Sequence, residues 1–426
     1  MIKKISFIGF LPFFVAFLDY DYFPVSAILF IFLIKFKIFE IYFKKIYLLI
    51  FVNFFYIIRF ISSIYPNMNN FWISASQKNY SLNGKFIDIQ GVFWNLNCNS
   101  LNASEYTLFG TEQTLLCPYS VSYGPFFKFI AYENNVLLNS YVFSFFSILL
   151  ILIYFNFLIF KAQSANFYFI ALISISPPIN FLIERMNLDI FIFISIFVCY
   201  KCIKNDNIRN LFLFFLALLK YYPIIFIFGS LIFKMLNKNK ALFSEILLLF
   251  LFTFIYLYEN ILNENPYPPV QPFRVDRTFG ILSQSIAFER IFNVNKNVAY
   301  IALILFIATL FFLLRKMFDY SKVISDQFTH DVVFTFIIIS LIANYDYRIP
   351  LLFLILNTLL ESKNCNLVIL FILFVFSSPS PLHSYEKYFY MVEDNLFIYL
   401  DFTFYFFLVY LLLEYSLYFR SKRNTL

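Results

Sequence analysis

A long apolar run decides the fold class of this chain. Residues 141–160 read YVFSFFSILLILIYFNFLIF, and residues 397–418 form a second run of similar character. Such runs approach the roughly 20 apolar residues that a helix needs to cross a bilayer, and they recur along the whole sequence. Of the 426 residues, 61% are hydrophobic and 13% are charged, whereas about a quarter are charged in an ordinary soluble domain. The sequence therefore predicts an integral membrane protein.

The recurring runs predict an all-α, polytopic protein of about 14 transmembrane or re-entrant helices. We treat the chain as a single membrane domain in which residues 1–45 contain an additional N-terminal helical hairpin. The basic, apolar start of the chain is expected to be a retained first helix, because no small-residue cleavage site follows it. The expected helices span 5–18, 24–39, 46–62, 137–160, 166–182, 188–203, 210–219, 223–236, 241–258, 299–315, 329–343, 349–360, 366–377 and 397–418.

Basic residues set the expected orientation. With the N-terminus in the cytosol, the connectors that contain Lys45, Lys161, Lys204, Lys238 and Lys322 all face inward, in agreement with the positive-inside rule. Both termini are then cytoplasmic, and the protein is expected in the cell (inner) membrane. Segments 63–136 and 259–298 become two extracytoplasmic loop regions, with a composition suited to extended or irregular backbone. The net charge of +7 follows from these connectors and does not indicate a nucleic-acid partner.

The segment 210–236 can be read as one kinked helix or as two short helices that turn at residues 220–223, which read KYYP. One helix would export the basic residues at 234–240, so we expect two. Two helices this short place the turn below the outer membrane surface. A lysine at that depth must face protein or a polar cavity, so Lys220 is expected to hold a phosphate or to pair with Asp189. A snorkelling lysine at a helix end is the alternative.

Two further charged segments reach the same outer face. Residues 184–189 place Glu184, Arg185, Asn187 and Asp189 between two apolar spans, where ionisable groups must face water, one another or a ligand. An Arg–carboxylate pair that locks two helices is the structural alternative. Residues 344–350 place Asp346 and Arg348 at another outward helix junction. An arginine presents a planar fork that suits phosphate or carboxylate.

The first outer loop supplies a candidate base, Asp88, and two cysteines, Cys98 and Cys117. In an oxidising periplasm these cysteines could close a loop of about 20 residues by a disulfide worth roughly 3 kcal/mol. The chain contains no phosphate-binding glycine loop and no cluster of histidines. We therefore expect neither a cofactor nor a required metal, and a donor that arrives through the lipid.

Several of these segments resemble glycosyltransferase family 87, the polyprenol-phosphate-mannose-dependent members of the GT-C membrane fold. Residues 184–189 (ERMNLD) resemble its E-R-G-N-x-D signature, and 219–223 (LKYYP) its L-K-x-Y-P segment, which includes Tyr222. Residues 283–286 (SQSI), with Gln284 and the later Arg290, resemble its N-Q-S-L…R stretch, and 345–348 (YDYR) its D-Y-R motif. Residues 123–125 (YGP) stand where the family has Y-P-P. Met186, Gly124 and Ser283 depart from the family pattern.

The resemblance implies inverting transfer of a mannose-like hexose from a polyprenyl phosphate to an extracytoplasmic hydroxyl. The acceptor would be a glycolipid, a polysaccharide or a protein. Asp88 would be the base, and Arg185, Lys220 and Arg348 would bind the donor phosphate. Around them, Glu184, Asn187, Asp189, Tyr222, Gln284 and Asp346 would orient these groups. A transporter or flippase of lipid-linked or anionic substrates, and an O-antigen-polymerase-like enzyme, are the alternatives.

Overall fold

The computed structural model describes 3–5, 8–18, 22–35, 39–41, 44–64, 105–107, 114–116, 136–162, 166–185, 187–237, 242–258, 278–316, 318, 322–341, 344–377 and 402–424. These residues are almost entirely helical, and their few strands are two or three residues long. The all-α prediction is confirmed at this level. Asp88, Cys98 and Cys117 lie outside the described residues.

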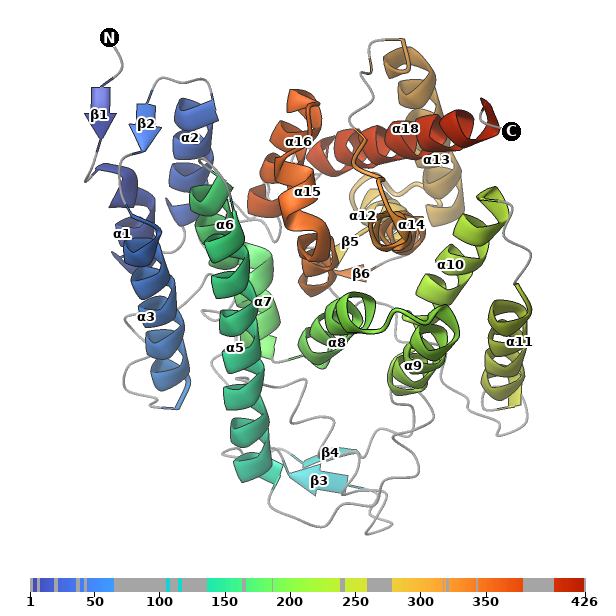
Figure 1. The fold of residues 1–426 in the computed structure, drawn as a ribbon, viewed down its shortest axis with the longest axis horizontal. Coiled ribbons are helices and arrows are strands. Elements are labelled where there is room, and N and C mark those ends of the chain that lie inside the picture. The colour runs from blue at the N-terminus through green and yellow to red at the C-terminus, as the bar shows by residue number, and fades with distance from the viewer. Residues whose placement is uncertain are drawn as a thin grey trace.

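The N-terminal part is a group of helices packed side by side. Helices α1 (Leu11–Leu18) and α2 (Phe23–Lys35) form a hairpin, and strands β1 (Lys3–Ile5) and β2 (Phe39–Ile41) pair in parallel beside it. The long helices α3 (Lys45–Ile64) and α5 (Val136–Lys161) run together, and α6 (Asn166–Ser174) packs on both (Figure 1). Two strands that lie between α3 and α5 in sequence, β3 (Glu105–Thr107) and β4 (Thr114–Leu116), pair antiparallel.

The central part consists of α7 (Pro177–Arg185), α8 (Asp189–Cys202), α9 (Asp206–Leu219), α10 (Ile224–Leu236) and α11 (Phe243–Leu257). Helices α9, α10 and α11 pack on one another, and α11 lies at the edge of the molecule (Figure 1). Residues 210–236 therefore form two helices, as predicted. The break follows from sequence, because Pro223 cannot continue a helix from its N-terminal side and Lys220 has an extended backbone, with φ −154°.

The C-terminal part begins with strand β5 (Thr278–Phe279) and contains six α-helices among the described residues. Strand β5 pairs antiparallel with β6 (Asn344–Tyr345), which leads directly into the 3₁₀ helix η7 (Asp346–Ile355). The six helices are α12 (Ile281–Phe292), α13 (Lys296–Leu314), α14 (Gln327–Leu341), the short α15 (Leu356–Leu360) after η7, α16 (Cys365–Ser377) and α18 (Phe402–Asn424). Helix α14 packs on α10, and α18 packs on α16, α13 and α14.

Three expectations about local structure were wrong. The second loop region, 259–298, contains α12 over Ile281–Phe292 and the start of α13. The expected helix 166–182 is two helices, α6 and α7, because Pro177 and Pro178 interrupt the run. The expected helix 349–360 is a long 3₁₀ segment followed by one α-helical turn, with Pro350 inside the 3₁₀ segment.

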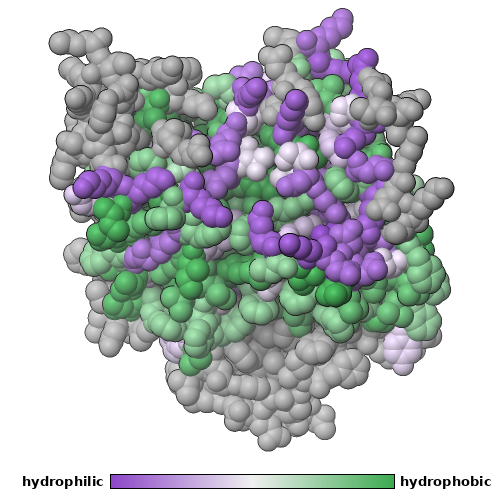
Figure 2. Space-filling view, viewed as in Figure 1, coloured by the Kyte–Doolittle hydropathy of each residue, from purple (hydrophilic) through white to green (hydrophobic). Residues whose placement is uncertain are grey.

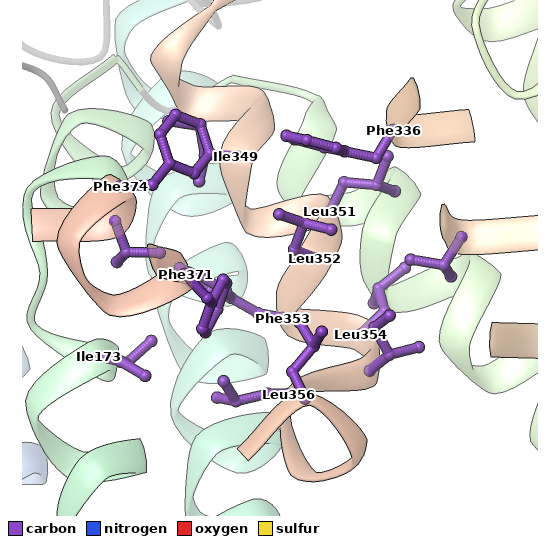
Figure 3. Close-up of a cluster of buried hydrophobic side chains, with 14 of the residues drawn as sticks. Ile173, Phe336, Ile349, Leu351, Leu352, Phe353, Leu354, Leu356, Phe371 and Phe374 are labelled. Atoms are coloured by element: carbon purple, nitrogen blue, oxygen red, sulfur yellow. The ribbon is translucent and has the colours of Figure 1, made fainter. Parts of the chain in front are cut away.

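The core of the molecule lies around η7. Every residue from Ile349 to Ile355 whose exposure is described is buried, and the side chains of Leu351, Leu352 and Phe353 meet those of Phe371 and Phe336 (Figure 3). The hydroxyl of Tyr154 donates a hydrogen bond to the carbonyl of Phe353 over 2.7 Å. This packing fixes η7 on several sides and, with it, the residues at its start.

Among the residues that the structure describes, two helices are long and apolar enough to cross a membrane, Tyr141–Lys161 and Lys296–Leu314. Seven further apolar helices in this part of the chain are shorter. Large apolar side chains face outward along several helices, including Phe250 on α11 (71% exposed) and Leu305 on α13 (62% exposed). On the face shown in Figure 2, hydrophilic residues gather in a band above a hydrophobic zone. A count of about 14 spans remains a prediction.

Candidate functional site

A buried ion pair joins the start of α8 to the end of α9. The ammonium nitrogen of Lys220 lies 2.8 Å from Oδ2 of Asp189. It also donates to Oδ1 of Asn187 over 2.7 Å. Asp189 is fully buried and Lys220 is 4% exposed. Two residues 31 positions apart in sequence therefore form one contact, which is the pairing considered for Lys220 as an alternative to phosphate binding.

Local backbone structure explains why Asp189 stands where it does. Asp189 is the first residue of α8, and a carboxylate at a helix N-terminus is favoured by the helix dipole. The side chain of Asn187 accepts a hydrogen bond from the backbone N–H of Asp189 over 3.1 Å. The same amide oxygen accepts from Lys220. Asn187 thus holds both the first turn of α8 and the lysine.

A second cation reaches the same carboxylate from the other half of the chain. The Nε atom of Arg348, at the start of η7, lies 3.8 Å from Oδ2 of Asp189. The guanidinium carbon lies 5.5 Å from the centre of the Tyr222 ring, within the range of a cation–π contact. The Tyr222 ring in turn packs on Phe193, at 6.1 Å between centroids.

These contacts define the Asp189 cluster, which consists of Asn187, Asp189, Lys220, Tyr222 and Arg348. Its described side chains carry two cations against one carboxylate. Both cations therefore approach the same oxygen, Oδ2 of Asp189. Arg348 is the more open of the two cations, because its side chain is 21% exposed and that of Lys220 is 5% exposed.

The structure describes the other predicted site residues only in part. Glu184 and Arg185 end helix α7, and Asp346 begins η7, but the side chains of all three lie outside the described residues. Gln284 is 3% exposed on α12. The pairing of β5 with β6 ties the start of α12 to the segment that carries Arg348. The predicted base Asp88 and the possible disulfide of Cys98 with Cys117 fall outside the described residues.

A second group of buried charges lies between α9, α10 and α11. Lys234 lies 2.5 Å from Oε1 of Glu245 and 3.3 Å from Oδ2 of Asp206. Arg209 lies 2.8 Å from Oδ1 of Asp206, and the side chain of Asn210 donates to Glu245 over 2.6 Å. We call these five residues the Glu245 cluster. Sequence analysis placed the basic residues at 234–240, which include Lys234, on the inward side and did not predict that Lys234 would be buried and paired.

No family model, curated protein or solved structure matches this chain. The resemblance to glycosyltransferase family 87 therefore remains a prediction. No group of three metal-ligating side chains occurs among the residues that the structure describes.

Proposed function

We propose that the chain is a polytopic membrane protein that transfers a hexose from a polyprenyl phosphate to an extracytoplasmic hydroxyl. The membrane part of this proposal is supported by the two long apolar helices and by outward-facing apolar side chains, such as Phe243 (77% exposed) and Phe312 (67% exposed). Soluble proteins rarely expose contiguous apolar surface on this scale. Lipid contact accounts for these faces without a protein partner.

The observation that carries the enzymatic part is the meeting of Lys220 and Arg348 at Asp189. When the sugar leaves, the polyprenyl phosphate gains negative charge. Cations held in fixed positions stabilise that charge more in the transition state than in the ground state. The buried lysine is pinned by two hydrogen bonds, so it would need little reorganisation.

Arg348 is proposed to make the direct phosphate contact. Its planar fork suits two phosphate oxygens at once, and its side chain is the more exposed of the two cations. Asp189 would then orient the cations, with Asn187 and Tyr222 supporting it. An inverting mechanism needs one carboxylate to take the proton of the acceptor hydroxyl. We propose Asp88, the candidate from the sequence, for this role. No metal enters this proposal.

The test is sugar transfer by the purified full chain, with radiolabelled polyprenyl-phosphate hexoses as donors and a membrane lipid extract as acceptor. Arg348→Gln should lower the rate of transfer about 10²-fold. Arg315→Gln, at an exposed position on the C-terminal end of α13, is the matched control and should keep it. Asp88→Asn should abolish transfer if Asp88 is the base. Equal rates for Arg348→Gln and Arg315→Gln would contradict the proposed phosphate contact.

One observation favours a second function, transport of a lipid-linked or anionic substrate. Helices α9 and α10 carry buried charges at both of their ends, namely Lys220 at their junction and the Glu245 cluster at the far ends. Charges at several depths are typical of a translocation path. Uptake of a labelled polyprenyl-phosphate sugar into vesicles, without any transfer product, would favour the transporter over the enzyme.

A further inference from the structure

Two lysines and three phenylalanine rings form a continuous row across the ends of α5, α8 and α14. Lys161, in the last turn of α5, has its ammonium nitrogen 4.4 Å from the centre of the Phe157 ring. That ring packs on Phe197 of α8, at 6.3 Å between centroids. Lys201, in the last turn of α8, lies 5.8 Å from the Phe197 ring and 5.4 Å from that of Phe328, which begins α14 with Gln327. We call Lys161, Phe157, Phe197, Lys201 and Phe328 the lysine–phenylalanine row.

The topology predicted from the basic connectors puts this row at the inner membrane surface. The expected spans 137–160 and 188–203 both end on the inner side, and 329–343 begins there. The ring contacts are consistent with this common level, because they join the end of α5 and the end of α8 to the start of α14. Helix α8 has 14 residues and is therefore about 20 Å long. The row lies at the opposite end of α8 from Asp189, so the proposed sugar transfer does not use it.

Exposed apolar side chains lie beside both lysines. Residues three and four positions apart share one face of a helix. Phe157 and Phe160 therefore lie on the same side of α5 as Lys161, and Val198 lies on the same side of α8 as Lys201. Phe160, Val198 and both lysines are exposed. An apolar face that ends in ammonium groups suits the boundary between acyl chains and lipid headgroups.

The acidic side chains on the adjoining segments have other partners. Asp206, at the start of α9, pairs with Arg209 and Lys234. Asp326, just before α14, accepts a hydrogen bond from the backbone N–H of Thr329 over 2.8 Å. Among the described residues, no carboxylate oxygen lies within ion-pair distance of either lysine of the row. The row therefore presents two positive charges over an aromatic and apolar surface.

A third lysine occupies the carbonyl groups at the end of α5. The ammonium nitrogen of Lys45 donates to the carbonyl oxygen of Phe160 over 3.0 Å and also to that of Ala162. Carbonyl groups at a helix C-terminus carry partial negative charge, which disfavours an anion nearby. Because Lys45 offsets this charge, the ammonium group of Lys161 is left to attract an anion.

We propose that the lysine–phenylalanine row binds the headgroup of an anionic glycerophospholipid at the inner membrane surface. The phosphate-bearing headgroup lies over the row and contacts both ammonium groups, and an acyl chain runs along Phe160 and Val198. Basic sites between helices on the cytoplasmic side are suited to anionic lipid headgroups. A lipid fits better than soluble phosphate, because a free anion makes no use of the apolar side chains beside the lysines. The proposal rests on the membrane part of the proposed function and is independent of sugar transfer.

The test is native mass spectrometry of the purified full chain in a neutral detergent, without any sugar donor. The dissociation constants of phosphatidylglycerol and phosphatidylcholine with the same acyl chains are compared, so that only the headgroup differs. The wild type should bind phosphatidylglycerol more tightly. One lysine near an anionic lipid surface strengthens binding about 5-fold, so Lys161→Gln combined with Lys201→Gln should weaken phosphatidylglycerol binding about 25-fold. Equal affinity of the wild type for the two lipids would overturn the proposal.

Matched variants separate this site from general surface charge. Arg315→Gln combined with Lys316→Gln removes two exposed basic residues at the C-terminal end of α13 and should leave lipid binding unchanged. Lys161→Arg combined with Lys201→Arg keeps both charges and should retain it. Equal weakening in the α13 pair and in the Lys161→Gln, Lys201→Gln pair would show that binding follows net charge alone and would contradict the site. Displacement of the lipid by an equal concentration of glycerol phosphate would identify a soluble phosphate ligand and would contradict a lipid one.

Discussion

The two ionic clusters differ in how closely their cations are held. In the Glu245 cluster, Lys234 lies 2.5 Å from Glu245 and Arg209 lies 2.8 Å from Asp206, and the side chains of both cations are buried. In the Asp189 cluster, Lys220 lies 2.8 Å from Asp189, but Nε of Arg348 lies 3.8 Å away and its side chain is 21% exposed. Cations held at contact distance stabilise helix contacts. A cation that reaches solvent can meet an anion, which is why we place the proposed phosphate contact at Arg348.

The largest expected effect is on the Glu245 cluster. Lys234→Met leaves Glu245, which is 0% exposed, without its nearest cation. Breaking a buried pair in this way costs about 3–5 kcal/mol of unfolding free energy. Thermal or denaturant unfolding in detergent measures the loss, and the exposed Lys316→Met is the control. A loss no larger than that of the control would show that the Glu245 cluster is not structural.

The second prediction concerns Lys220. Lys220→Met removes two hydrogen bonds to charged or amide oxygens, but Arg348 stays 3.8 Å from Asp189. We expect a smaller loss of stability, about 2 kcal/mol, together with loss of sugar transfer. Unfolding and transfer are measured on the same preparation. Destabilisation as large as that of Lys234→Met would mean that the two clusters play the same role.

The third prediction concerns Arg348→Gln. Arg348 lies at the long end of the ion-pair range and its side chain is 21% exposed, so its removal should change the unfolding free energy by less than about 1 kcal/mol. The rate of transfer should nevertheless fall strongly, as argued above. Stability and activity are thus separable at Arg348. A variant that lost both in proportion would assign Arg348 to folding instead of phosphate binding.

The smallest effect is expected at a neutral polar pair. Asn53 on α3 and Asn156 on α5 exchange two side-chain hydrogen bonds, of 3.2 and 3.0 Å. Hydrogen bonds between helices in a membrane contribute about 0.6 kcal/mol each. A double-mutant cycle with Asn53→Val and Asn156→Val should therefore give a coupling of about 1 kcal/mol. A coupling near that of the ionic clusters would show that charge is not what distinguishes them.

Sequence predicted the members of the Asp189 cluster because ionisable residues between apolar spans are few and costly. The topology predicted from the basic connectors puts Asp189, Lys220 and Arg348 on the same face. Sequence did not predict which partner each would choose, because the 3.8 Å approach of Arg348 depends on how η7 packs. Helix α12 was not predicted because the prolines of 259–298 favour irregular backbone, and this expectation was extended to the whole segment.

The contacts of His330 and Asp331 could not be predicted from the sequence. The neighbours His330 and Asp331, near the start of an apolar helix, were the available signal. Asp331 accepts a hydrogen bond from Tyr200, which is 131 positions away, and His330 contacts the hydroxyl of Tyr415, which is 85 positions away. The chain contains 32 tyrosines. Nothing in the sequence marks these two among them.

The 3₁₀ form of η7 controls how far Arg348 reaches. Ten residues span about 20 Å as a 3₁₀ helix and about 15 Å as an α-helix. Pro350 has no N–H to complete an α-helical turn at this point, and its ring would clash with the carbonyl of Asp346. Because Leu351 and Leu352 fix the body of η7 in the core, any shortening would shift its N-terminal end. Arg348 would then be drawn away from Asp189, so the length of η7 sets the spacing between the two cations.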